Sequence, residues 1–267
     1  MNVSEIVLIG ANGLVGSAFR RYFDHLGQPY KVIQRENASS HGITSCDLLI
    51  NCAGGANKRK ANSDTGWDLK QSVLNILPYF IGIQAKKIVH ISSVDVYPKT
   101  AHKNDTKEEL SGQLDGHHTY GFHKLFVENY VRQFCSDYLI LRLPALVGPG
   151  LTKNPIFDFF DPEKLLLISP KSRLNVVHVD DVASMAMDLV KMKVVNETFN
   201  LAAVDMLKLE GLKTHFKIEY SCADGAIDNI QNYDINVSKI SKIMPMKNSL
   251  DSVIKYYNDI SCVKKNV

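Results

Sequence analysis

The feature that most restricts the fold is a glycine-spaced turn, GANGLVG at residues 10–16, between an apolar run and a helical pattern. EIVLI comes directly before this turn and LVGSAFRRYFDHL overlaps its end, so it joins an expected strand to an expected helix. We expect Gly10 to turn the chain tightly, Gly13 to let backbone approach a pyrophosphate, and Gly16 to pack the helix close to a sheet. The N–H groups that open the helix would face the phosphates. The turn predicts dinucleotide binding, and a turn for packing alone is the alternative.

The rest of the first half alternates short β-branched runs with helical patterns, which is typical of a parallel sheet with crossover helices. The expected strands are 5–9, 30–34, 47–51, 87–92, 138–143 and 198–201, and the expected helices are 13–26, 66–84, 120–135 and 181–192. Only about a dozen residues separate the second and third strands, so we expect a trimmed third βα unit. The sequence predicts a Rossmann-like doubly wound parallel sheet in residues 1–150. A smaller C-terminal substrate lobe, 151–267, is expected to interleave with the last sheet elements.

Bulk properties exclude several other classes of protein. The net charge of the 267 residues is only +3, with 22% charged residues, which does not favour binding to nucleic acid or to an anionic membrane. No apolar run approaches the roughly 20 residues that span a bilayer, and no signal-peptide pattern precedes the first strand. The cysteines show no metal-ligand spacing and are expected to be reduced thiols of a cytoplasmic protein: Cys46, Cys52, Cys135, Cys222 and Cys262.

The end of the second expected strand indicates which nicotinamide cofactor fits. In YKVIQRENAS, Gln34 stands where a carboxylate would accept a hydrogen bond from the adenosine ribose, and Arg35 follows it. A carboxylate would repel a 2′-phosphate, whereas a guanidinium binds one through paired hydrogen bonds. The pattern favours NADP(H), with Arg35 as the main contact and Asn12 or Ser39 as helpers. NAD(H) is the alternative, with Glu36 serving the ribose.

A tyrosine and a lysine stand four residues apart in HHTYGFHKLFVENYV, which begins at residue 117. Leu125, Val127 and Val131 recur at helical intervals, so Tyr120 and Lys124 are expected on one face of a helix. A phenol and an ammonium would then reach the same small volume. When the pair is considered alone, an exposed aromatic beside a solvated lysine is the favoured explanation.

Several strings of the chain, taken together, resemble the extended short-chain dehydrogenase/reductases of the NAD-dependent epimerase/dehydratase family, which act largely on nucleotide-activated sugars. GANGLVG resembles the glycine turn of this family, and DLLINCAGG resembles its fourth strand and the small residues that follow. ISSVDVYP resembles the segment that carries the catalytic serine or threonine, and YGFHK resembles the Tyr-x-x-x-Lys motif. LILRLPALVGPG, VVHVDDVA, ETFNLA and YDINVSKI resemble later family segments in the same order.

The resemblance implies roles for three residues. Tyr120 would exchange a proton with a carbonyl or alcohol oxygen, and the ammonium of Lys124 would lower its pKa and hold the nicotinamide ribose. Ser93 would hydrogen-bond the same oxygen and fix it for hydride transfer. The cofactor contacts that we expect are Gly10, Asn12, Gly13, Leu14, Val15, Gly16, Arg35, Ala53, Gly54, Ser92, Tyr120, Lys124 and Pro144.

Departures from the family pattern reduce the number of reactions that we expect of this chain. Dehydratases of this type carry Asp-Glu after the catalytic residue, but here Val94 replaces the first carboxylate and only Asp95 matches the second. The proton-shuttling cysteine of the fucose-synthase-like reductases is also missing. We therefore expect an NADPH-dependent ketoreductase acting on a nucleotide-linked keto-deoxysugar, as in deoxysugar and polysaccharide biosynthesis. A 4-epimerase with bound NAD and a catalytically silent NADP-binding regulatory protein are the alternatives.

The substrate side is less marked in the sequence. The residues expected to contact substrate are Asp95, His118, Asn154 and Arg173. Arg173 lies near the place where the family keeps an arginine that binds the diphosphate, and Asn154 follows GPGL. For His118, a structural role is the alternative. The resemblance further implies a homodimer formed through paired helices.

Overall fold

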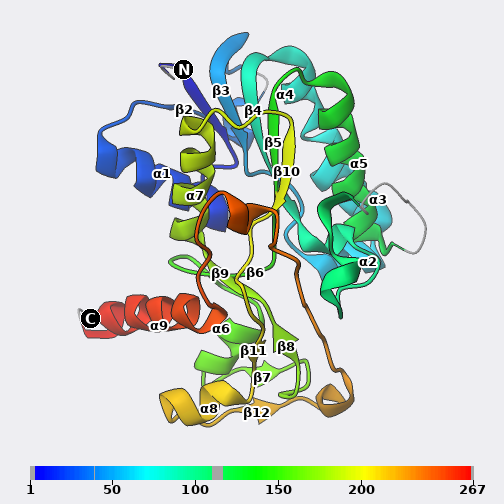
Figure 1. The fold of residues 1–267 in the computed structure, drawn as a ribbon, viewed down its shortest axis with the longest axis vertical. Helices are drawn as coiled ribbons and strands as arrows, with labels where there is room; N and C mark the ends of the chain where they lie inside the picture. Colours follow the sequence, from blue (N-terminus) through cyan, green and yellow to red (C-terminus); the bar gives the residue numbers. More distant parts are fainter. Residues whose placement is uncertain (1–3, 39, 110–116, 266–267) are drawn as a thin grey trace. The chain divides into compact units, whose positions relative to one another are not determined.

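The computed structural model describes residues 4–38, 40–109 and 117–265 (Figure 1), so the expected helper Ser39 lies outside the described residues. The chain forms two compact units. Unit 1 consists of Met1–Pro98, Glu108–Arg142 and Asp180–Phe199, and unit 2 consists of Lys99–Lys107, Leu143–Val179 and Asn200–Val267. The expected domains, 1–150 and 151–267, differ from these units in three stretches, because 99–107 and 143–150 belong to unit 2 and 180–199 belongs to unit 1.

A six-stranded sheet with the order β10-β5-β4-β3-β1-β2 organises unit 1. Its strands are β1 (Ile6–Ile9), β2 (Lys31–Ile33), β3 (Ser45–Asn51), β4 (Gln84–Ser93), β5 (Tyr138–Leu143) and β10 (Glu197–Asn200). The pairs β1–β2, β1–β3 and β3–β4 are parallel. β1 is buried along its whole length and β3 along all but its first residue, as the continuously apolar strings predict. The predicted Rossmann-like sheet is confirmed.

Helices cover both faces of this sheet. Helices α1 (Leu14–Leu26) and α7 (Val179–Lys191) lie on one face, and α5 (Thr119–Phe134) lies on the other with the helices before β4 (Figure 1). Between β2 and β3 the described residues form only one 3₁₀ turn, η1 (Arg35–Asn37), in agreement with a trimmed third βα unit. The sheet is therefore doubly wound, as the sequence predicts.

The prediction of one helix over residues 66–84 is wrong. The segment forms α3 (Thr65–Leu69), a π-helical turn, η2 (Lys70–Leu74), and α4 (Leu77–Gly82), and β4 begins at Gln84. Pro78 stands in the first turn of α4, where its missing N–H group is tolerated, but it would break a hydrogen bond inside a longer helix. A further short helix, α2 (Lys58–Ser63), was not expected from the sequence.

The packing of α5 against the sheet sets the position of its first turns. Val127 and Val131 are fully buried and belong to one core cluster with Ile88 of β4 and Ile140 of β5. Burying each such side chain stabilises the fold by about 1.5–3 kcal/mol. Rotation of α5 about its axis would expose these residues, so their burial fixes which way the N-terminal end of the helix faces.

Unit 2 contains smaller sheets and its own core. Its strands are β6 (Ala145–Val147), β7 (Leu165–Leu166), β8 (Arg173–Leu174), β9 (Val176–His178), β11 (Leu207–Lys208) and β12 (Ser221–Cys222). They pair as β6–β9, β8–β11 and β7–β12. Its helices are α6 (Pro155–Phe160), α8 (Gly211–Phe216), α9 (Ser249–Lys265) and the 3₁₀ turns η4 (Lys103–Asp105), η6 (Ala226–Asp228) and η7 (Ile240–Lys242). Phe159, Phe160 and Tyr256 are central to its apolar cluster.

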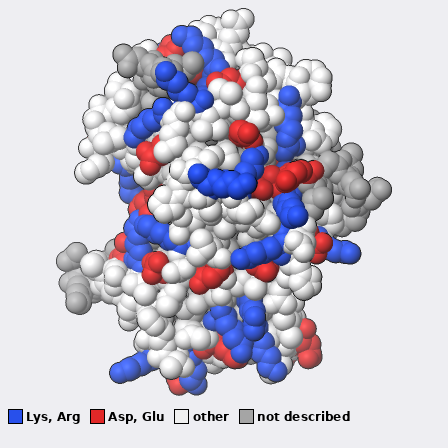
Figure 2. All heavy atoms as spheres, viewed as in Figure 1, with Lys and Arg blue, Asp and Glu red and all other residues white. Residues whose placement is uncertain are grey.

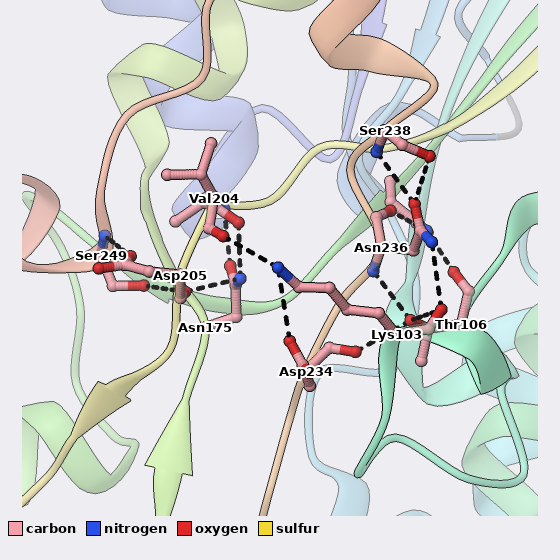
Figure 3. Close-up of polar contacts among 11 residues, drawn as sticks. Lys103, Thr106, Asn175, Val204, Asp205, Asp234, Asn236, Ser238 and Ser249 are labelled. Atoms are coloured by element: carbon pink, nitrogen blue, oxygen red, sulfur yellow. Dashed lines mark hydrogen bonds and ion pairs between the residues drawn. The ribbon is translucent and has the colours of Figure 1, made fainter.

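A polar network joins distant segments of unit 2 (Figure 3). The Lys103 ammonium donates to the Val204 carbonyl at 3.3 Å and lies 3.9 Å from the Asp234 carboxylate. The Thr106 hydroxyl accepts a hydrogen bond from the Asn236 N–H at 2.8 Å and donates to the Asp234 carbonyl at 2.9 Å. These contacts hold residues 99–107 in unit 2.

The surface shows no single-sign field on the face drawn in Figure 2, where Lys and Arg are interspersed with Asp and Glu. Within residues 4–38, 40–109 and 117–265, no helix is long and apolar enough to cross a membrane. The same part of the chain contains no group of three or more His, Cys, Asp or Glu side chains that could hold a metal ion.

Candidate active site

The glycine turn has the geometry of a phosphate cradle. Gly10 has φ +77°, and a Cβ there would lie 2.7 Å from the Ala53 nitrogen. A Cβ on Gly16 would lie 2.1 Å from the Gly10 carbonyl oxygen, so both positions require glycine. Gly13 is the N-cap of α1, and no described side chain caps this end of the helix. The backbone N–H groups of its first turn, at Leu14 and Val15, therefore suit a pyrophosphate.

Beside this turn, a polar cluster marks the place expected for the adenosine end of a cofactor. The Asn12 side-chain oxygen accepts from Arg20 at 3.1 Å and lies 3.5 Å from the Gln34 amide nitrogen. Arg35 is exposed at the start of η1, and its guanidinium donates to Gln71 at 3.3 Å. Arg20 was missed by the sequence reasoning, although it lies one helical turn after Gly16 in the sequence and that spacing was the available signal.

Behind the glycine turn, the ends of β3 and β4 are tied together by buried groups. The Ala53 N–H donates to Asn51, whose amide nitrogen lies 3.0 Å from Nδ1 of His90. Burial, and then the positive charge of Lys124, lower the pKa of His90 to about 3, so its ring is neutral. Gly54 has φ +141°, and a Cβ there would lie 2.9 Å from the Lys124 ammonium. The predicted contacts Ala53 and Gly54 thus lie beside both the turn and Lys124.

Ser93, Tyr120 and Lys124, which lie on two different elements, come together. Ser93 ends β4, and its hydroxyl hydrogen-bonds the Tyr120 phenol on the first turn of α5. The Lys124 ammonium lies 5.8 Å from the centroid of the Tyr120 ring. Lys124 is buried, and Tyr120 is half-buried. The structure therefore places a hydroxyl, a phenol and an ammonium in one small volume.

The start of α5 explains how Tyr120 reaches Ser93. The His118 ring caps the helix, because its Nδ1 accepts from the Gly121 N–H at 3.1 Å. A Cβ on Gly121 would lie 2.1 Å from the Asp95 carbonyl oxygen, so glycine permits the close approach of α5 to η3 (Val94–Val96). The Tyr120 N–H donates to Asn62 of α2 at 3.1 Å. These backbone contacts fix the tyrosine beside the end of β4.

The expected lowering of the Tyr120 pKa by Lys124 is wrong. Burial, and then the negative charges of Asp95 and Asp68, raise the pKa of Tyr120, and the hydrogen bond with Ser93 only partly opposes them. The pKa of Lys124 is itself lowered by burial, with Asp68 the first of the carboxylates that oppose this change. The ammonium is thus balanced by carboxylates, and the phenol stays protonated at neutral pH.

Asp95, expected to contact substrate, lies at the centre of a charged cluster. Its Oδ1 lies 2.6 Å from the Lys58 ammonium and 3.8 Å from Nε2 of His118. Its backbone N–H donates to the Ser93 hydroxyl oxygen at 3.1 Å, and its Oδ2 lies 3.4 Å from the same atom. Lys58 was missed, because a run of basic residues, KRK, does not reveal which one faces a site.

A second buried carboxylate, Asp68 on α3, was also missed. It accepts hydrogen bonds from Ser72 at 2.8 Å and pairs with Nδ1 of His123 at 2.8 Å. The Ser72 hydroxyl in turn accepts from the Gly55 N–H at 3.1 Å. This chain of contacts connects the loop after β3 to α5. Nothing in the local sequence distinguishes Asp68 from a solvated residue, because its burial results from tertiary packing.

Ser92, expected among the cofactor contacts, faces the opposite way. Its hydroxyl donates to buried Glu128 on α5 at 2.5 Å. Glu128 also accepts from Arg142 and Arg132, each at 2.6 Å, and Arg142 donates to the Tyr97 hydroxyl at 2.8 Å. Burial alone would raise the pKa of Glu128, but the two arginines outweigh burial and lower it to about 2. The side chain of Ser92 therefore belongs to a buried network, which does not favour its expected role as a cofactor contact.

The remaining predicted residues belong to unit 2. Pro144 is half-buried between β5 and β6. Asn154 caps α6 by accepting from the Phe157 N–H at 2.8 Å, and its amide nitrogen donates to the Leu146 carbonyl at 2.7 Å. Both polar groups of Asn154 thus have partners within the unit, which does not favour its expected role in substrate binding. Arg173 is exposed on β8.

Comparisons with known proteins agree with this architecture. A model of the NAD dependent epimerase/dehydratase family matches residues 6–202. Among similar solved structures, a UDP-galactose 4-epimerase is 19% identical to this chain, with 96% of this chain and 98% of that chain covered and a TM-score of 0.74. RMD from Pseudomonas aeruginosa, complexed with NADPH, is 17% identical, with 96% of this chain and 99% of that chain covered and a TM-score of 0.76. UDP-glucuronic acid 4-epimerase from Bacillus cereus, in complex with UDP-glucuronic acid and NAD, is 17% identical, with 97% of this chain and 99% of that chain covered and a TM-score of 0.77. No match to this chain is found among curated protein sequences.

Proposed function

The chain belongs to the NAD dependent epimerase/dehydratase family, and on that basis we propose that it reduces a ketone on a nucleotide-linked deoxysugar, using NADPH. The observation that carries this proposal is the convergence of Ser93, Tyr120 and Lys124. A phenol in that position can give a proton to a ketone oxygen as hydride arrives at its carbon.

The residues around the glycine turn fit a nicotinamide dinucleotide. The turn has backbone that a Cβ would obstruct, and the first turn of α1 offers N–H groups for a pyrophosphate. Arg35 and Arg20 supply positive charge where a 2′-phosphate would lie, and Gln34 replaces the usual carboxylate there. RMD was solved with NADPH, which supports this choice, while the Bacillus cereus epimerase was solved with NAD.

The bound cofactor supplies hydride from its nicotinamide ring. In our proposal, Ser93 and Tyr120 hold the ketone oxygen through two hydrogen bonds and so orient the carbonyl carbon. Tyr120 then gives its phenolic proton to that oxygen as negative charge develops there. Lys124 binds the nicotinamide ribose. Solvent reprotonates Tyr120 before the next turnover.

A nucleotide-sugar 4-epimerase is the second candidate, because two of the solved structures described above are 4-epimerases. Such an enzyme must first remove a proton from an alcohol, so it would start from oxidation, and the assay that follows separates the two directions. A catalytically silent regulatory protein is the third candidate, and the intact set of Ser93, Tyr120 and Lys124 argues against it. The proposed reduction belongs to deoxysugar and polysaccharide biosynthesis in the cytoplasm.

The test is to incubate the protein with NADPH or NADH and a panel of nucleotide-linked 4-keto-6-deoxysugars while following reductant absorbance. We expect NADPH consumption with at least one substrate. Tyr120→Phe should lower kcat by roughly 10²–10⁴-fold, because the proton donor is lost and the ring remains. Interconversion of sugars without reductant consumption would favour the epimerase. Dinucleotide binding without either reaction, over a broad panel, would favour the regulatory protein.

We also propose that the protein is a homodimer formed through α5. Phe122, Phe126 and Phe134 are spaced by multiples of four along this helix and have exposed fractions of 37%, 44% and 69%. Exposed apolar side chains at such spacing form a stripe that a second copy of the same helix can cover. Sedimentation should show a dimer that Phe126→Asp weakens. A monomer at every concentration would contradict this proposal.

A further inference from the structure

The charged cluster on Asp95 contains a residue with no role in the reaction described so far. The Lys58 side chain, 39% exposed on α2, contacts Oδ1 of Asp95 at 2.6 Å. The Asp95 carboxylate is only 14% exposed, so its negative charge lies partly out of water. Its second oxygen, Oδ2, is directed toward the Ser93 hydroxyl at 3.4 Å. Lys58 and Ser93 are therefore connected through the two oxygens of one carboxylate.

The Ser93 hydroxyl has a single proton and more than one acceptor within reach. Its oxygen already accepts from the Asp95 N–H at 3.1 Å. Its proton can go to Oδ2 of Asp95 or to an oxygen held between Ser93 and Tyr120. A carboxylate is a stronger acceptor than a ketone oxygen, because hydrogen bonds to charged groups are about twice as strong as neutral ones. The 3.4 Å separation shows that this competing bond is long.

We propose that Lys58 is a positioning residue for this reaction: by holding the Asp95 carboxylate, it keeps the Ser93 proton available to the substrate oxygen. The ammonium neutralises the carboxylate and holds it through Oδ1, which leaves Oδ2 at the limit of hydrogen-bonding distance from Ser93. Without Lys58, the Asp95 carboxylate would turn toward Ser93 and accept a hydrogen bond from its hydroxyl group. This inference rests on the proposed ketone reduction.

His118 does not take over this task. Its Nδ1 is occupied as the acceptor that caps α5, so only Nε2 of the ring can donate toward Asp95. That nitrogen is 3.8 Å from Asp95, beyond hydrogen-bonding distance, whereas Lys58 is at 2.6 Å. Protonation of the ring on Nδ1 would remove the cap. Lys58 is thus the closer of the two groups on Oδ1.

The cluster also affects the phenol, because several charged or titratable groups face Tyr120. These groups are Asp95 from η3, Asp68 with His123 from α3 and α5, Lys124 from α5, His118 at the helix cap, and Lys58 through Asp95. Loss of Lys58 removes one positive charge from beside Asp95 and so makes the surroundings of the phenol more negative. Tyr120 would then hold its proton more strongly, so proton transfer to the substrate would slow. Loss of Lys58 would thus affect both Tyr120 and the hydroxyl proton of Ser93.

The test uses the full-length protein with the substrate identified in the reductase assay. Lys58→Met keeps the length of the side chain and removes its charge, so we expect kcat to fall about tenfold with KM changed less than threefold. Lys58→Arg should recover most of kcat. Lys60→Met is the matched control, because Lys60 on the same helix lies over the Trp67 ring, 4.6 Å from its centroid, and should leave kcat unchanged.

A double-mutant cycle separates this role from a structural one. In the Asp95→Asn background, Lys58→Met should change kcat by less than twofold, because the carboxylate that it restrains is gone. A crystal structure of Lys58→Met supplies a readout that needs no turnover. There, the Ser93 oxygen should approach Oδ2 of Asp95 to about 2.7 Å.

The outcomes separate this inference from the proposed function. If the unaltered protein reduces no ketone in the panel, the proposed function fails whatever Lys58 does. If it does reduce one, but Lys58→Met retains kcat or loses it equally with and without Asp95, the inference is overturned. An unchanged Ser93–Asp95 distance of 3.4 Å in the Lys58→Met structure would overturn it as well. Equal melting temperatures for the Met and Arg variants exclude misfolding as the cause.

Discussion

Two adjacent serines at the end of β4 face two different carboxylates. Ser92 donates to Glu128 inside the sheet–helix core, and Ser93 contacts Asp95 at the candidate active site. Successive side chains of a strand point to opposite faces, so one backbone segment serves both environments. The two serines offer the same hydroxyl group to a carboxylate, and what differs is the surroundings of each acid.

The difference lies in how fully each carboxylate is enclosed. Glu128 is fully buried, and its two oxygens accept from Ser92, Arg132 and Arg142. Asp95 is 14% exposed, and its Lys58 partner is 39% exposed. A buried ion pair that is satisfied on every side holds its elements in one arrangement. A half-open pair can instead respond to substrate, so we assign the first cluster to the fold and propose that the second serves the chemistry.

The largest expected effect comes from breaking the enclosed pair. Glu128→Gln leaves the Arg142 guanidinium buried without its counter-charge, which should lower the free energy of unfolding by about 3–5 kcal/mol. Asp95→Asn should lower it by less than about 1 kcal/mol, because that carboxylate and its lysine are partly solvated. Urea unfolding of both variants measures the contrast. Equal losses would mean that enclosure does not distinguish the two clusters.

The next expected effect is that alanine substitution lowers activity at one of the two serines and stability at the other. Ser93→Ala should lower kcat by roughly 10²–10³-fold, as loss of one donor to the reacting oxygen does, with little change in unfolding. Ser92→Ala should keep kcat within about threefold but lower the free energy of unfolding by about 1–3 kcal/mol, because a buried acceptor loses its partner. Turnover and urea unfolding on the same samples would show this crossed pattern. If both variants lost activity alike, Ser92 would belong to the site.

The third expected effect is a loss of unfolding free energy at acid pH. The pKa of Glu128 is lowered in the folded chain from 4.5 to about 2, so its contribution is present above pH 4.5 and is lost as pH falls toward 2. The size of this contribution is about 3 kcal/mol. The difference in unfolding free energy between the unaltered protein and Glu128→Gln should therefore shrink between pH 4.5 and 2. A difference that stays constant over this window would contradict the enclosed pairing.

The sequence predicts well those features that depend on local spacing. Gly10 and Gly16 were recognised because the turn needs backbone without Cβ, and the structure places Gly10 oxygen where a Cβ on Gly16 would stand. The separation of four residues puts Tyr120 and Lys124 on one helical face, as predicted, whereas their expected roles came from the resemblance to the family. The strands were recognised from apolar runs. All of these signals lie within one element or one turn.

Features that depend on contacts between distant segments were missed. The division of residues 66–84 into three helical pieces, the burial of Asp68 and the pairing of Lys58 with Asp95 involve partners far away in the sequence. The raised pKa of Tyr120 has the same origin, because burial and carboxylates from other elements outweigh the lysine on its own helix. Spacing along the chain does not report any of these distances.

The smallest expected effect extends the comparison to a charge in open solvent. Arg35 is exposed, so Arg35→Ala should leave the free energy of unfolding within about 0.5 kcal/mol. Its proposed partner, the 2′-phosphate, is present only on NADPH, so binding of NADPH should weaken roughly ten- to hundredfold and binding of NADH should be unchanged. Calorimetry with both nucleotides measures this, and Arg59→Ala, an exposed arginine on α2, is the matched control. Equal losses for both nucleotides would place Arg35 away from the phosphate, and Arg20 would then be the arginine to test.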